Sequence, residues 1–73
     1  MTKGYILEIA ELNNFNIDRE VSDLAGTHFF TVGNPTTDLV FMYRDHKDGD
    51  YYLMGLYKVN EANRMMDRIP KTR

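Results

Sequence analysis

The sequence predicts an α+β fold: a four-stranded, mostly antiparallel sheet with one or two short helices packed on one of its faces. Two observations lead to this prediction. Four short segments are rich in β-branched and aromatic residues and end at turn-forming residues, which is typical of strands. Two other segments carry apolar residues at helical spacing. The expected order along the chain is β-α-β-β-β-α.

The first expected element is a strand over residues 4–12, because Tyr5, Leu7 and Ile9 alternate with their neighbours. A short helix is expected next, with Asn16 as its N-cap and Gly26 just beyond its C-terminus. Its apolar residues form one stripe, made of Ile17, Val21, Leu24 and Ala25. The connection from the first strand to the next is compatible with a parallel crossover or an antiparallel pairing, and both stay open.

The rest of the chain predicts three strands and a final helix. Residues 27–32 form the second strand, and residues 39–44 and 51–59 form a hairpin whose connection contains an Asp-Gly turn signal. The last helix covers residues 60–69 and stops before Pro70. Its apolar stripe consists of Ala62, Met65, Met66 and Ile69.

A chain of 73 residues without cysteine predicts one small domain, residues 1–73, of marginal stability and without disulfides. Residues 70–73 are expected to be a disordered tail. No apolar run approaches the roughly 18 residues that span a bilayer, and the N-terminus lacks the pattern of a signal peptide. We therefore expect a cytoplasmic protein that does not enter a membrane.

The charge is uneven along the chain. Residues 1–57 carry four Lys or Arg against nine Asp or Glu, a net charge of −5. Residues 58–73 carry five against two, a net charge of +3. An acidic body with a basic end can steer association with another protein. A protein that binds duplex DNA usually spreads positive charge over a whole face, so this class is disfavoured.

The sequence offers no constellation for catalysis or metal binding. The acidic loop 45–50 fails the EF-hand pattern at three of its four oxygen positions, which indicates a solvated turn. The two histidines, His28 and His46, are isolated, whereas zinc sites usually take three or four ligands. The single serine, Ser22, lies among acids in the expected helix. We expect no enzymatic activity, no metal and no cofactor.

Residues 51–57 are apolar or aromatic on both faces of any strand they form. Because helices on one face cannot cover both faces of strands 39–44 and 51–59, some of these side chains are expected to meet a protein partner. Two arginines spaced i, i+4 on the last helix are expected to meet an acidic surface. The candidate protein-contact residues are Phe41, Tyr43, Tyr52, Met54, Leu56, Arg64 and Arg68. Which sheet face is exposed stays open.

These features favour a small non-enzymatic regulator or inhibitor that binds a larger macromolecular machine, as a monomer or weak homodimer. A virus-encoded regulator of a host enzyme, for instance of the transcription machinery, fits the size. The alternative is a single-stranded nucleic-acid-binding module with an aromatic sheet face. The acidic surroundings, and Met54-Gly55-Leu56 in place of a basic-Gly-aromatic signature, disfavour it. A small-molecule enzyme of unknown type is the second alternative.

Overall fold

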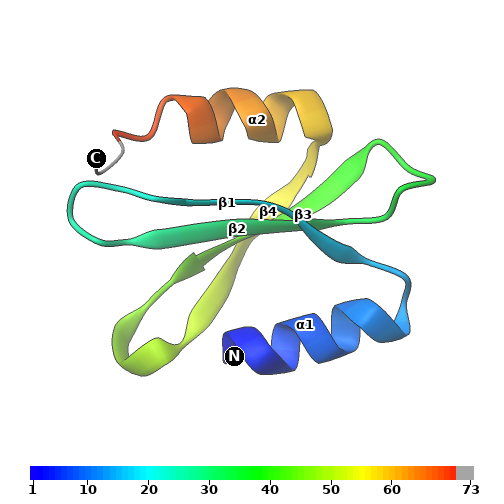
Figure 1. Cartoon of the computed structure of the whole chain (residues 1–73), viewed down its shortest axis with the longest axis horizontal. Coiled ribbons are helices and arrows are strands. Elements are labelled where there is room, and N and C mark those ends of the chain that lie inside the picture. Colours follow the sequence, from blue (N-terminus) through cyan, green and yellow to red (C-terminus); the bar gives the residue numbers. More distant parts are fainter. Residues whose placement is uncertain (71–73) are drawn as a thin grey trace.

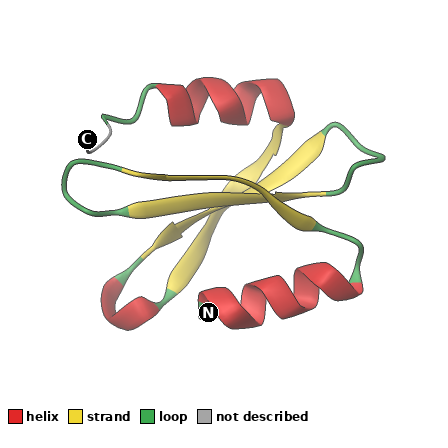
Figure 2. Cartoon of the chain, viewed as in Figure 1, coloured by secondary structure: helices red, strands yellow, loops and turns green. Residues whose placement is uncertain are grey.

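The computed structural model describes residues 1–70. A four-stranded antiparallel sheet in the order β1-β2-β3-β4 carries one helix on each side (Figure 1), and Figure 2 shows the same view by type of element. The elements are α1 (Lys3–Leu12), β1 (Asn16–Ser22), β2 (His28–Gly33), β3 (Leu39–Asp45), the 3-10 turn η1 (Lys47–Gly49), β4 (Tyr51–Lys58) and α2 (Val59–Asp67). The predicted α+β class and antiparallel sheet are confirmed. The first two predicted elements are exchanged.

Residues 4–12 form most of helix α1, so the predicted strand there is wrong. Thr2 is the N-cap, and its Oγ1 accepts a hydrogen bond from the backbone N of Tyr5 at 3.2 Å. Ile6 and Ala10 are both buried, and their spacing of four residues is the period of a helix. The apolar residues of this segment satisfy both periods, and packing against the sheet selects the helical one.

The predicted helix over residues 16–26 is also wrong, because these residues form β1 and the turn that follows it. Asp23 Oδ1 accepts a hydrogen bond from the backbone N of Thr27 at 2.8 Å. Gly26 has a φ of 86°, a left-handed conformation that glycine adopts readily. The residues that suggest a helix C-terminus therefore close a hairpin between β1 and β2. Leu24 lies in this turn and is 68% exposed.

The two helices lie on opposite faces of the sheet, which corrects the predicted single helix layer (Figure 1). Phe29 and Phe30 are consecutive in β2 and point to opposite faces. Phe30 packs with Ile6 and Ala10 of α1, and Phe29 packs with Met66 of α2. We call these the α1 face and the α2 face. Each face has its own core, so the sheet is buried on both sides at its centre.

A β-bulge in β4 changes which of its residues share a face. The pairing of β3 with β4 leaves Met54 as an extra residue. Leu53 is the partner of Tyr43 and Leu56 is the partner of Phe41. Because paired residues share a face, both leucines lie on the α1 face. Strict alternation would have separated them.

The remaining predicted elements are confirmed: β2, β3, β4 and α2 begin and end within two residues of their expected bounds. Of the predicted tail 70–73, only Pro70 belongs to the described residues. Within residues 1–70, neither helix has the length and continuous apolar sequence needed to cross a lipid bilayer.

Candidate functional site

Helix α1 covers only part of the α1 face. Strands lie about 4.8 Å apart, so a sheet of four strands is wider than one helix of about 10 Å diameter. Phe30 and Val32 of β2 are buried beneath α1, and Lys3 of α1 forms an ion pair with Glu20 of β1. These contacts hold the helix over β1 and β2, and Tyr51 at the start of β4 packs against Phe30 beneath it. The other side chains that β3 and β4 direct to this face lie beside the helix and are only partly covered; they are Phe41, Tyr43, Leu53 and Leu56.

A groove of about 390 Å³ lies between α1 and strand β3. Its lining residues are Ile6, Ile9, Ala10, Asn13, Phe15, Val32, Phe41 and Tyr43. Asn13 is the one member with a polar amide, so the groove is mainly apolar and aromatic. Phe15 and Phe41 lie against one another, with ring centroids 5.7 Å apart. A concave apolar surface of this kind is typical of a binding site.

Exposed apolar side chains extend the groove on both sides. On the helix side, Tyr5, Ile9 and Leu12 are exposed, and their i, i+4, i+7 spacing places them on one flank of α1. Ile9 lines the groove, so this flank faces it. On the sheet side, Leu53 and Leu56 of β4 are 46% and 50% exposed. We call the groove together with Tyr5, Leu12, Leu53 and Leu56 the open apolar face.

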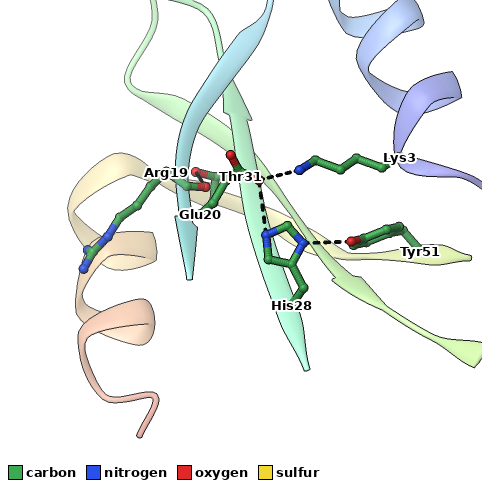
Figure 3. Close-up of polar contacts among 6 residues, drawn as sticks. All are labelled: Lys3, Arg19, Glu20, His28, Thr31 and Tyr51. Atoms are coloured by element: carbon green, nitrogen blue, oxygen red, sulfur yellow. Dashed lines mark hydrogen bonds and ion pairs between the residues drawn. The ribbon is translucent and has the colours of Figure 1, made fainter. Parts of the chain in front are cut away.

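A chain of polar contacts fixes the start of α1 to the sheet (Figure 3). Lys3 Nζ donates to Glu20 Oε1 at 2.5 Å, and the same oxygen lies 3.2 Å from His28 Nε2. The Tyr51 hydroxyl lies 2.8 Å from His28 Nδ1. These four residues come from α1, β1, β2 and β4. Arg19, next to Glu20 in β1, points the other way (Figure 3). It forms an ion pair with Asp67 of α2.

The environment shifts the pKa values of three ionisable groups on the α1 face. The hydrogen bond from Lys3 holds the pKa of the Glu20 carboxyl below its ordinary value, although partial burial opposes this. Burial raises the pKa of the Tyr51 hydroxyl, and the carboxylate of Asp45 raises it further. Burial alone raises the pKa of Tyr43. At neutral pH the α1 face therefore carries an ionised Glu20 and the neutral hydroxyls of Tyr43 and Tyr51.

The charged residues are distributed unevenly between the two sides of the sheet. Arg19 contacts α2, Arg44 lies over the ring of Phe29 on the α2 face, and Arg64 and Arg68 belong to α2 and its C-cap. All arginines within residues 1–70 therefore lie on the α2 side. The charged residues that the helix and the strand register assign to the α1 side are Lys3, Glu8, Glu11, Glu20, Asp45 and Lys58. Four acids against two lysines make that side acidic.

The predicted contact residues are divided between the two faces. Phe41 and Tyr43 line the groove and Leu56 lies beside it, so these three come together. The residues on the α2 side are Tyr52, Arg64 and Arg68. Met54 is exposed in the bulge of β4. The predicted set is therefore not one continuous surface.

The prediction from sequence missed the helix side of the open apolar face, formed by Tyr5, Ile9 and Leu12. Their i, i+4, i+7 spacing was the available signal, together with Thr2 as an N-cap three residues before Tyr5. Leu53 was missed because a bulge cannot be recognised from alternation. No cluster of three or more His, Asp or Glu side chains that could hold a metal ion occurs in the part of the chain that the structure describes.

Comparison with known proteins gives no assignment: no protein-family model, curated protein or solved structure matches this chain.

Proposed function

We propose that this chain is a small non-enzymatic binding protein that regulates or inhibits a partner protein held against its open apolar face. The observation that supports the proposal is the continuity of the apolar groove with exposed aliphatic side chains on both its walls. Single exposed apolar residues are ordinary, but continuous apolar patches beyond a few hundred Å² usually mark an interaction site.

The energetics favour a partner that fills the groove as well as touching its rim. Fully burying an aliphatic side chain contributes about 1.5–3 kcal/mol, so covering the exposed parts of the four aliphatic residues Ile9, Leu12, Leu53 and Leu56 contributes about 5 kcal/mol. Association costs roughly 4–15 kcal/mol in lost freedom of motion. The rim residues alone therefore do not hold a partner. The partner must also reach Phe41 and Tyr43 at the floor of the groove.

Affinity capture with matched variants tests the proposal. The immobilised wild-type protein, the Leu53→Glu/Leu56→Glu variant and a Leu24→Glu control are each exposed to lysate of the native cell. Leu24 is an exposed leucine in the β1–β2 turn, away from the groove, so the control adds a charge without touching the open apolar face. We expect a protein that the wild type and the control retain and the double variant loses. Identical proteins retained by all three would overturn the proposal.

Single-stranded nucleic-acid binding is the second candidate, and the placement of the arginines favours the α2 side for it. Tyr52 is exposed and pairs with Arg44 in the sheet, which puts an aromatic ring beside a cation. The acidic α1 side would repel phosphates. Fluorescence anisotropy with a labelled single-stranded oligonucleotide at low and high salt tests this candidate. Salt-sensitive binding that is lost with Tyr52→Ala and Arg44→Ala would support it.

A further inference from the structure

We propose that the open apolar face takes an amphipathic helix of the partner with basic residues along one flank. This inference rests on the proposed function and specifies the occupant of the same site. The occupant lies beside α1 and above β3 and β4. It would form a second helix on the α1 face and cover the part of the sheet that α1 leaves exposed.

The dimensions of the site match one helix. Two neighbouring strands present a floor about 10 Å wide, and packed helices keep their axes about 8–10 Å apart. The floor here is formed by Phe41, Leu53 and Leu56, and the side wall is the flank of α1 with Ile9 and Leu12. A helix in this position contacts the floor and the wall at once. It therefore needs an apolar arc of at least about 100°.

Charge complementarity selects a basic helix. Glu8 is exposed on α1 and Asp45 is directed to the same side of the sheet, against Lys58 at the end of β4, and the arginines within residues 1–70 lie on the opposite side. Glu11 lies on the other flank of α1, beside Asn14 and Asn34. Lys or Arg along the incoming helix would meet the carboxylates of Glu8 and Asp45. An acidic flank would be repelled.

A second copy of this chain fits the site less well. Helix α1 already packs Ile6 and Ala10 against its own sheet, so a second copy would have to present its own open apolar face. That face carries Glu8 beside Tyr5 and Leu12, and Asp45 is directed to the same side. Two copies would therefore bring the same acidic residues to one interface, and like charges there oppose association. A partner helix with basic residues avoids this penalty.

An extended strand is also disfavoured, although β4 is at the edge of the sheet. The start of that edge is occupied by the chain's own N-terminus: the backbone N of Tyr51 donates to the carbonyl oxygen of Met1, and Thr2 bridges to Asp50. The bulge at Met54 then interrupts the regular edge. Only a short, irregular stretch remains for pairing with an added strand.

Three synthetic peptides of about 18 residues, long enough to form an isolated helix, test the inference with the intact protein. One has a leucine stripe at helical spacing and lysines on its flanks, one has the same stripe with glutamates, and one alternates leucine and lysine as a strand would. We expect the lysine-flanked helix to bind most tightly and more weakly at high salt. We expect Leu53→Glu/Leu56→Glu to weaken it about tenfold or more, and Leu24→Glu to leave it unchanged.

The outcomes separate this inference from the proposed function. Tighter binding of the alternating peptide, or of the glutamate-flanked helix, would overturn the basic helix. So would a dimer in sedimentation that the Leu53→Glu/Leu56→Glu variant abolishes, because the occupant would then be a second copy. Failure of the lysine-flanked helix to displace a captured partner would overturn the inference alone, since that partner would still depend on Leu53 and Leu56. Capture of a partner that does not depend on Leu53 and Leu56 would overturn both the inference and the proposed function.

Discussion

A matched pair of core valines tests whether the sheet is buried on both faces. Val32 of β2 lies in the core beneath α1, and Val40 of β3 lies in the core beneath α2; they are 2% and 1% exposed. Changing either one to alanine removes two buried carbon groups, about 1.6 kcal/mol of transfer free energy. The cavity that remains adds to this, so each change is expected to lower the free energy of unfolding by about 2–3 kcal/mol.

Urea denaturation followed by circular dichroism measures this loss. A chain of 73 residues is expected to have about 4–11 kcal/mol of stability, so both variants should still fold. Leu24→Ala is the control, and because Leu24 is largely exposed its loss should stay below about 0.5 kcal/mol. A helix layer on one face only would leave one valine on an open surface. Tolerance of Val32→Ala or Val40→Ala at the level of the control would therefore refute the two-sided core.

Three further predictions concern the α1 face and the hairpin loop. Leu53→Glu/Leu56→Glu should lower the unfolding free energy by no more than about 2 kcal/mol, because both side chains are already half in water; a larger loss in urea titrations would show that they belong to the core. Glu20 has a lowered folded pKa, so its contribution to stability is present above the ordinary glutamate pKa, about 4.3, and is lost as pH falls through the lowered value. Glu20→Gln should therefore cost less than about 1 kcal/mol at pH 7 and flatten the acid side of the stability profile; an unchanged profile would contradict this. Thermal melts with calcium and with a chelator should coincide, and a shift of several degrees that Asp48→Asn with Asp50→Asn removes would establish a site in the loop.

The second half of the chain could be predicted from sequence because its signals agree with one another. The strands β2 to β4 combine β-branched and aromatic residues with clear turns, and α2 has one apolar stripe and a proline beyond its end. In residues 4–12 the signals conflict, since Ile6 with Ala10 follows a helical period while Tyr5, Leu7 and Ile9 alternate. Contacts with distant residues such as Phe30 decide between the two. Local pattern does not contain that information.

The candidate site could be predicted only on its sheet side. Phe41, Tyr43 and Leu56 were proposed because helices on one face cannot cover both faces of the sheet. The structure has a helix on each face, and these side chains are accessible for a different reason: α1 alone is narrower than the sheet. That a partner contacts them stays a prediction. Tyr52 was placed with them because alternation takes no account of the bulge. The contribution of α1 could not be foreseen while residues 4–12 were expected to be a strand.

The extra residue in β4 also determines how one strand serves two cores. Tyr51 packs with the core beneath α1 and Tyr57 with the core beneath α2, although six positions separate them. An even spacing in a regular strand keeps two side chains on the same face, so only the extra residue Met54 allows each tyrosine to reach its own core. Sequence length is therefore under tighter constraint inside this strand than in the turns. In homologous chains the loops should vary in length, whereas the number of residues between these two tyrosines should stay odd.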